Sequence, residues 1–169
     1  RNYRIDTSGN GNDGTSVNVF WKTGGMEGGY GEFSGSSYVA LGNPAALNIT
    51  GQIAIAAWVR VDSTGGLRNI VSRGYARNPN GEVQLRINSG NYQVGIWNGA
   101  DAGTSASIPS GDADTWVHLV GTYDGIAWKL YRNGELLSST NSAMGAVSVN
   151  SGWAIGARST GTERFFDGG

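Results

Sequence analysis

The sequence contains no cysteine, only 3 prolines in 169 residues, and a formal net charge of only −1. The absence of cysteine excludes a disulfide scaffold, thiolate zinc sites and cysteine nucleophiles. No apolar run approaches the ~18 residues that a membrane span needs. No block of like charge suggests binding to nucleic acid or to an anionic membrane surface. We therefore expect neither nucleic acid nor a membrane as a partner.

Glycine and aromatic residues are abundant instead. There are 29 glycines, 6 tryptophans and 7 tyrosines. A glycine share about double the usual ~7% indicates many turns, and the large aromatic groups argue against disorder because the chain can bury them. The length allows one domain with its own core. We therefore predict a single domain over residues 1–169.

The clearest local pattern lies in residues 116–134. Val117 and Leu119 alternate with polar or smaller neighbours, which predicts a strand. Asp124-Gly125 signals a tight hairpin turn, because such turns need positive φ. A return strand and a second turn at Asn133-Gly134 follow. The pattern predicts two strands of an antiparallel meander.

The rest of the chain alternates short strands with glycine-containing turns. Residues 53–61 are apolar on both alternating faces, which predicts a central strand covered on both sides. A hairpin is expected over 82–98 with its turn at Ser89-Gly90, whereas 24–31 and 99–114 read as a glycine-rich connection and a long polar loop. About eleven to thirteen short strands at this spacing are typical of an all-β sandwich or barrel.

Several runs then match a known pattern in order. Residues 116–125 follow W-x-H-x-x-G-T-Y-D-G, residues 130–134 resemble LYvdG, residues 53–60 resemble ftiaaWvk, and residues 6–15 match DsSGNGNdGt. Together they resemble the laminin-G-like domains of concanavalin A-like jelly-roll type. The resemblance implies an all-β, two-sheet antiparallel β-sandwich. It assigns four residues to the scaffold: Trp58, Trp116, His118 and Tyr123.

Members of this family usually continue past a final F-x-G with one more strand. The resemblance implies that this strand pairs near the amino-terminal strand, closes a sheet and carries an aspartate near a calcium ion. The sequence stops at Gly169, so we expect an unpaired edge unless a further segment or another chain supplies the strand. It opens at Arg1 with no signal peptide, and we interpret it as a mature or excised part of a secreted protein.

Residues 6–15 form a candidate metal loop. Calcium takes six to eight oxygens from carboxylates, amides and carbonyls in a flexible loop. The resemblance implies a structural calcium centred on Asp6, to which Asn10 and Asn12 contribute. An Asx-rich turn without an ion is the alternative interpretation.

The 82–98 hairpin carries a candidate sugar-binding face. Alternation directs Val83, Leu85, Ile87, Val94 and Ile96 to the core. The opposite face then carries Gln84, Arg86, Gln93 and Trp97, and an aromatic ring beside planar hydrogen-bonding groups suits a glycan. Lys129 and Tyr131 are expected to extend this face on a neighbouring hairpin. Packing of Trp97 under a loop is the alternative. Further aromatic candidates are Trp21, Tyr75, Tyr92 and Trp153.

Enzymatic motifs are missing from the sequence. The acidic residues are scattered, without the E-x-D-x-E pattern that places two carboxyls about 5–9 Å apart on one strand of jelly-roll glycoside hydrolases. No G-x-S-x-G, zinc spacing or phosphate-binding loop occurs. We predict a non-catalytic carbohydrate-binding module of a secreted, polysaccharide-degrading bacterial protein, with uronate or sulfated polymers suited to its arginines. A protein-binding adhesion module and a hydrolase or lyase of the same fold remain the alternatives.

Overall fold

The computed structural model of the protein describes residues 3–77, 80–159 and 161–169, so Arg1 lies outside the described part. Short strands dominate, and two single 3₁₀ turns, η1 (Ala45–Leu47) and η2 (Ser110–Asp112), are the helical elements among these residues. The strands are β1 (Tyr3–Arg4), β2 (Gly14–Val17), β3 (Phe20–Gly25), β4 (Gly28–Glu32), β5 (Tyr38–Gly42), β6 (Ile53–Arg60), β7 (Leu67–Arg77), β8 (Asn80–Asn88), β9 (Asn91–Trp97), β10 (Asp101–Ser107), β11 (Trp116–Tyr123), β12 (Ala127–Arg132), β13 (Glu135–Asn141) and β14 (Trp153–Ile155).

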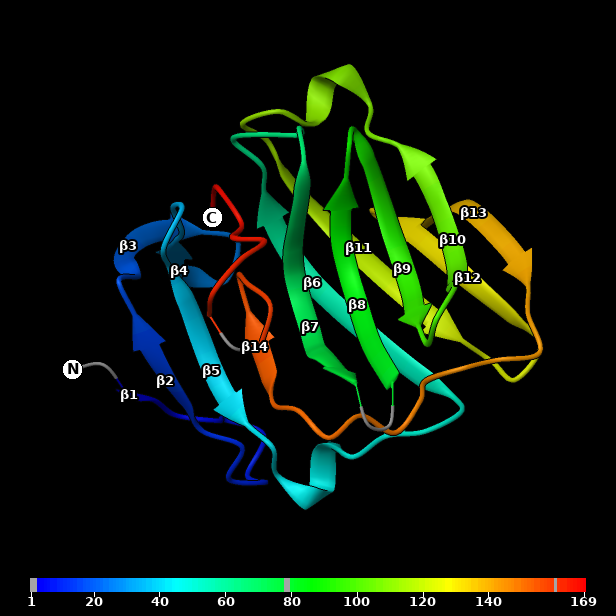
Figure 1. Cartoon of the computed structure of the whole chain (residues 1–169). Helices are drawn as coiled ribbons and strands as arrows, with labels where there is room; N and C mark the ends of the chain where they lie inside the picture. The colour runs from blue at the N-terminus through cyan, green and yellow to red at the C-terminus, as the bar shows by residue number, and fades with distance from the viewer. Residues whose placement is uncertain (1–2, 78–79, 160) are drawn as a thin grey trace.

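The strands form two layers (Figure 1). An eight-stranded sheet has the order β1-β2-β5-β14-β7-β8-β9-β10, and a four-stranded sheet has the order β13-β12-β11-β6. A separate hairpin joins β3 to β4. Pairing between these strands is antiparallel throughout. The all-β, two-sheet antiparallel sandwich expected from the sequence is therefore confirmed.

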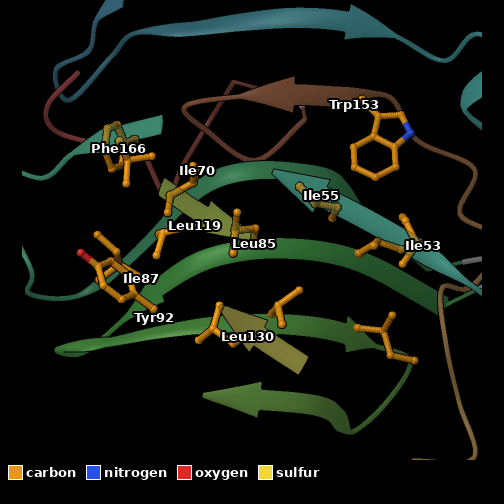
Figure 2. Close-up of a cluster of buried hydrophobic side chains, with 14 of the residues drawn as sticks. Ile53, Ile55, Ile70, Leu85, Ile87, Tyr92, Leu119, Leu130, Trp153 and Phe166 are labelled. Atoms are coloured by element: carbon orange, nitrogen blue, oxygen red, sulfur yellow. The ribbon is translucent and has the colours of Figure 1, made fainter. Parts of the chain in front are cut away.

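The hydrophobic core lies between the two sheets (Figure 2). Leu85 and Ile87 of β8 face Leu119 of β11 and Leu130 of β12, and all four are fully buried. Burying a side chain of this kind contributes about 1.5–3 kcal/mol to stability. The sheets approach each other closely at Gly121, where a Cβ atom would lie 2.3 Å from a methyl carbon of Val94.

Two of the predicted turns have the expected backbone. Asn133 and Gly134 have φ values of 49° and 86°, and Ser89 and Gly90 have 47° and 83°, as two-residue hairpins require. The turn at Asp124 is longer than predicted, because β11 ends at Tyr123 and β12 begins only at Ala127. The Asp124 carboxylate closes this loop by accepting bonds from the backbone N–H groups of Ile126 and Ala127, both at 2.9 Å.

Two segments expected to be irregular are strands. Residues 24–31 belong mostly to the β3–β4 hairpin, and residues 101–107, within the predicted loop 99–114, form β10 at the edge of the large sheet. Small residues such as Ala102, Thr104 and Ala106 alternate on the partly buried face of β10. An edge strand that packs through one face needs no large apolar residues, so the polar composition of β10 concealed its alternation.

The prediction of a central, covered strand at residues 53–61 was wrong for the described chain. β6 lies at the edge of the four-stranded sheet and pairs with β11 alone among the named strands. Its inward residues Ile53, Ile55 and Val59 are buried, but Trp58 on the other face is 39% exposed.

Candidate functional site

The 82–98 hairpin, made of β8 and β9, lies in the eight-stranded sheet between β7 and the edge strand β10. Its predicted core face is confirmed, because Val83, Leu85, Ile87, Val94 and Ile96 are all fully buried. Antiparallel pairing of β8, β9 and β10 places Trp97 directly between Glu82 and Asp101. Residues that pair directly share a face, so the three side chains lie on the sheet surface that faces away from the core.

A groove of about 410 Å³ opens on this surface. Strands β7 and β8 supply its first wall, β9 and β10 the second, and the segment after β14 closes one side. Its lining residues are Leu67, Tyr75, Glu82, Arg86, Asn88, Trp97, Asp101, Arg158 and Arg164. The groove therefore combines two aromatic rings with polar and charged groups.

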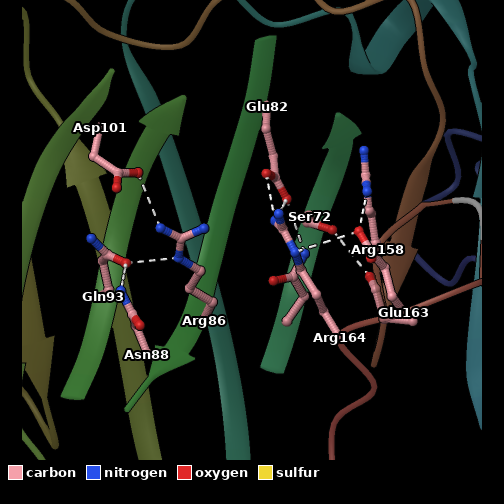
Figure 3. Close-up of polar contacts among 11 residues, drawn as sticks. Ser72, Glu82, Arg86, Asn88, Gln93, Asp101, Arg158, Glu163 and Arg164 are labelled. Carbon is pink, nitrogen blue, oxygen red and sulfur yellow. Dashed lines mark hydrogen bonds and ion pairs between the residues drawn. The ribbon is translucent and has the colours of Figure 1, made fainter. Parts of the chain in front are cut away.

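Arg86 is the buried anchor of the groove (Figure 3). Its Nε donates to Oε1 of Gln93 at 2.7 Å, and its Nη2 donates to Oδ1 of Asp101 at 3.1 Å. The same Gln93 oxygen accepts from Nδ2 of Asn88 at 3.3 Å. Burial lowers the pKa of Arg86, and the charge of Asp101 opposes this shift. The network fixes the planar groups of β8, β9 and β10 relative to one another.

A second ion pair joins the sheet to the carboxy-terminal segment. Glu82 is almost completely buried, and both of its carboxylate oxygens accept from Nη1 of Arg164, at 2.9 and 2.7 Å. Asn69 adds a bond from Nδ2 at 3.1 Å. Figure 3 shows Arg164 reaching across the ribbon to Glu82, beside the ion pair of Arg158 with Glu163.

The two aromatic residues of the groove are Trp97 and Tyr75. Both are half-buried. The guanidinium carbon of Arg158 lies 4.8 Å from the centroid of the Tyr75 ring, which is cation–π geometry. Tyr75, a candidate from the sequence, therefore joins Trp97 in one groove.

Gln84 does not belong to the open surface that the sequence predicted. It is 1% exposed and does not line the groove. Its cross-strand neighbour Ser72 donates to the carbonyl oxygen of Ala157 at 3.1 Å, so the segment after β14 crosses the sheet here. This covering segment is distant in sequence from the hairpin, and alternation alone could not reveal it.

Tyr131 lies on the other sheet and does not extend the Trp97 face. It belongs to β12, whose neighbouring residue Leu130 points into the core and is fully buried. Tyr131 and Lys129 therefore occupy the outer surface of the four-stranded sheet. The prediction took hairpins adjacent in sequence to be adjacent in one sheet, but the chain crosses between sheets before β11.

The remaining aromatic candidates divide by burial. Tyr92 and Trp153 are part of the core, so neither is available to a ligand, whereas Trp21 is exposed and lies outside the groove. Tyr123 has the predicted structural role, since it is buried and its hydroxyl donates to the Ser142 carbonyl at 2.8 Å. His118 stacks on Trp58 with ring centroids 5.0 Å apart.

The predicted calcium loop is organised around Asp6. Its Oδ1 accepts from the Ser8 N–H at 2.8 Å and its Oδ2 from the Asn12 N–H at 3.0 Å, while Asn10 donates to the Ser8 hydroxyl at 2.9 Å. The bonds from Ser8, and then from Asn12, lower the pKa of Asp6. An ionised carboxylate with Asx side chains beside it fits the oxygen chemistry of calcium. The same bonds also suit a plain Asx turn, so calcium at Asp6, Asn10 and Asn12 stays a prediction.

In residues 3–77, 80–159 and 161–169, no group of three or more His, Cys, Asp or Glu side chains gathers in a metal-binding arrangement. Within the same ranges, no helix has the length and apolar character needed to cross a membrane.

Sequence reasoning missed five polar or charged groove residues: Glu82, Asn88, Asp101, Arg158 and Arg164. Alternation could have found the first two, because they share the face of Arg86. Asp101 was hidden in the segment read as a loop. Nothing local marks Arg158 and Arg164, since only the path of the chain after β14 brings them to the groove.

Comparison with solved structures supports the fold. Domain 4 of AbnA, a GH43 extracellular arabinanase from Geobacillus stearothermophilus solved with arabinotriose, matches with a TM-score of 0.74 and 22% identity over 96% of this chain and 81% of that chain. The botulinum neurotoxin serotype D binding domain matches with a TM-score of 0.65 and 19% identity over 89% of this chain and 39% of that one.

A protein from Bacteroides ovatus that carries the name of a carbohydrate-binding protein matches with a TM-score of 0.61 and 20% identity, over 81% of this chain and 40% of that chain. No curated protein matches the sequence. The profile of the concanavalin A-like lectin/glucanases superfamily matches residues 33–169. The chain therefore belongs to the concanavalin A-like lectin/glucanases superfamily.

Proposed function

We propose that the protein is a carbohydrate-binding module and that the groove between Tyr75 and Trp97 is its glycan site. The observation that carries the proposal is the arrangement of two half-buried aromatic rings around a fixed set of planar polar groups. Aromatic rings stack on the C–H faces of sugars, and a few placed polar groups then set orientation and specificity. Arg86 acts as the positioning residue, because it holds Gln93 and Asp101 in place from the buried floor.

The charges of the groove favour a neutral glycan over a uronate or sulfated one. Each guanidinium has a carboxylate partner: Arg86 pairs with Asp101, Arg164 with Glu82, and Arg158 with Glu163. An anionic sugar would have to displace one of these carboxylates or approach it closely. The three pairs together carry no net charge, so the arginine content does not create a basic site.

The arabinotriose complex of AbnA domain 4 supports a neutral pentose oligosaccharide as the first ligand to test. That relative is part of an extracellular enzyme, which supports a secreted polysaccharide-degrading protein as the parent of this module. A linked binding module would raise the local concentration of a catalytic domain on its polymer. In this function the module itself is non-catalytic.

Two carboxylates of the groove resemble the catalytic pair of a glycoside hydrolase, so hydrolysis is measured as a control. Glu82 and Asp101 lie on either side of Trp97, and glycoside hydrolases use two carboxyls across a sugar. Both carboxylates are paired with guanidinium groups, and Glu82 is almost completely buried, so the two do not form an open acid–base pair across a sugar. Incubation of the isolated chain with arabinan should release no reducing ends.

Calorimetric titration with arabino-oligosaccharides tests the proposal. Trp97→Ala should weaken binding by roughly tenfold or more, because truncation of a central aromatic anchor costs about 1–2 kcal/mol or more. Tyr131→Ala removes an aromatic ring from the opposite sheet and should leave the affinity unchanged. Equal affinity of the Trp97 variant and the parent chain would refute this site.

A galacturonan oligosaccharide of the same length supplies the test of charge. We expect it to bind more weakly than the neutral ligand. Binding of the neutral ligand should also change little with added salt, since it involves no net charge.

A further inference from the structure

A row of side chains crosses the outer surface of the four-stranded sheet. Antiparallel pairing places Trp58 of β6 opposite His118 of β11, and their rings stack with centroids 5.0 Å apart. The turn after β12 adds Asn133, whose N–H donates to the His118 carbonyl at 2.8 Å. Trp58 and His118 point away from the core, because Val59 and Leu119 beside them point into it and are buried. The row therefore lies on the outside of one layer of the sandwich, and the proposed glycan groove lies on the outside of the other (Figure 1).

A cleft of about 460 Å³, which we call the Trp58 cleft, opens over this row. The β3–β4 turn forms its other wall through Met26, which is 51% exposed, and Trp58 is 39% exposed. The residues that line the cleft are Met26, Trp58, Trp116, His118, Asn133 and Gly134. No aspartate, glutamate, lysine or arginine is among these six residues. The cleft therefore combines apolar surface with hydrogen-bonding groups that carry no fixed charge.

The polar groups of the Trp58 cleft are free to bind a ligand. The core tryptophans Trp128 and Trp153 each donate their indole N–H to a backbone carbonyl oxygen at 2.9 Å. In contrast, the indole N–H of Trp58 and the two imidazole nitrogens of His118 have no hydrogen-bond partner within the described chain. Asn133 uses its Oδ1 to accept the His118 N–H at 2.9 Å, which leaves its Nδ2 without an acceptor among the described residues. An indole donor, an amide donor and an imidazole therefore surround the same cleft.

These groups match the chemistry of a neutral sugar. The indole of Trp58 and the side chain of Met26 suit the C–H face of a sugar ring, and sugar hydroxyls both donate and accept, as an imidazole and an amide require. An anionic ligand would find no lysine or arginine in the cleft. A purely apolar ligand would cover the donors without pairing them, at a cost of about 1–3 kcal/mol for each. We propose that the Trp58 cleft is a second sugar-binding site, which takes a neutral sugar unit.

The two sites differ in strength and in direction. The Trp58 cleft should bind more weakly than the Trp97 groove, because its polar groups lie at the surface without the buried network that fixes Gln93 and Asp101 around Arg86. With sites on opposite outer faces, one module holds two glycan chains at once. The ligand class follows from the groups of the cleft itself, whereas the choice of an arabino-oligosaccharide as the probe rests on the proposed function.

A nuclear magnetic resonance titration of the Trp97→Ala chain tests the second site with the first one weakened. Arabinotriose is added to ¹⁵N-labelled protein, and the indole signal of Trp58 and the imidazole signals of His118 are followed. They should shift saturably, with a dissociation constant at least about tenfold above that of the parent chain in calorimetry. Trp58→Ala in this background should remove the saturable shift at His118, and Trp58→Phe, which keeps a ring without the indole N–H, should weaken binding less. Tyr131→Ala removes a ring from the same outer face outside the cleft and should change nothing.

Thermal midpoints establish that each variant is folded. Met26→Ala, on the wall that does not belong to the sheet, repeats the test without changing the row of stacked rings and should weaken binding roughly threefold. Absence of a saturable shift at Trp58 and His118, or equal affinity at His118 with and without the Trp58 ring, would overturn the proposal.

The two sites fail separately in these measurements. If Trp97→Ala binds as tightly as the parent chain and Trp58→Ala alone abolishes binding, the Trp97 groove is refuted and the Trp58 cleft is supported. If Trp97→Ala abolishes all binding and the Trp58 and His118 signals do not move, the second site is refuted and the proposed function stands.

Discussion

Removal of the Arg164 guanidinium should destabilise the protein far more than its partly exposed position suggests. Arg164 is the cationic partner of Glu82, whose side chain is 1% exposed while that of Arg164 is 23% exposed. Arg164→Met keeps the length and apolar stem of the side chain and removes its charge. The Glu82 carboxylate would then keep its hydrogen bond from the Asn69 amide, in a position that water hardly reaches.

The size of the effect follows from that burial. Removing one partner of a buried ion pair costs about 3–5 kcal/mol, because the other charge stays buried. Arg164 is partly exposed, so water can reach the gap that it leaves, and we expect roughly 2–3 kcal/mol. For a chain of this size, each kcal/mol shifts Tm by about 2–4 °C. The midpoint should therefore fall by roughly 5–10 °C.

Chemical denaturation and thermal melts measure this loss, with Arg158→Met as the matched control. Arg158 pairs with Glu163, whose side chain is 48% exposed. Loss of Arg158 therefore leaves a carboxylate that water can reach, and we expect a cost of only about 0–1 kcal/mol. The double variant Glu82→Gln/Arg164→Met should be more stable than the sum of the single losses predicts, because no buried charge is left. A loss below about 0.5 kcal/mol for Arg164→Met, or strict additivity in the double variant, would refute this reasoning.

Three further predictions follow from single contacts. Asp112→Ala should cost about 3 kcal/mol, measured by denaturant unfolding, because buried Asp112 accepts the Arg132 guanidinium and the Tyr92 hydroxyl; an unchanged midpoint would contradict it. Hydrogen bonds from Lys129 and the turn lower the pKa of Asp124, so its stabilisation is present above the unfolded pKa of ~3.9 and is lost as pH falls below it. The stability advantage over Asp124→Asn should therefore shrink on acidification, and a constant difference would contradict this. If calcium binds the Asp6 loop, EDTA should lower the melting midpoint of the parent chain and leave that of Asp6→Ala unchanged; an unchanged parent midpoint would argue against calcium.

Local sequence patterns predicted the parts of the fold that local chemistry determines. The alternation that buries Leu85 and Ile87, and the turns at Ser89-Gly90 and Asn133-Gly134, depend on neighbours a few residues away. The family resemblance then placed the strands in two sheets. The sequence did not predict β10, because the alternation of apolar and polar residues is weak among its small side chains. The segment is nevertheless a strand, because it pairs with β9 over its whole length.

The site was predicted less well, because its shape depends on long-range packing. Arg86 and Trp97 were placed on one face correctly, but the same face was expected to be open. The segment after β14 covers Gln84 and brings Arg164 to Glu82, which lies 82 positions away in sequence. Similarly, Tyr131 is close in sequence to the hairpin face but belongs to the opposite sheet. No periodicity within one strand carries that information.

The central claim is that the Trp97 groove binds a neutral glycan, and one titration tests it most directly. Arabino-oligosaccharide is titrated into the parent chain and into Trp97→Ala, whose folding is checked by its thermal midpoint. We predict saturable binding by the parent chain and at least about tenfold weaker binding by the variant. Unaltered binding by a folded Trp97→Ala chain would contradict the account.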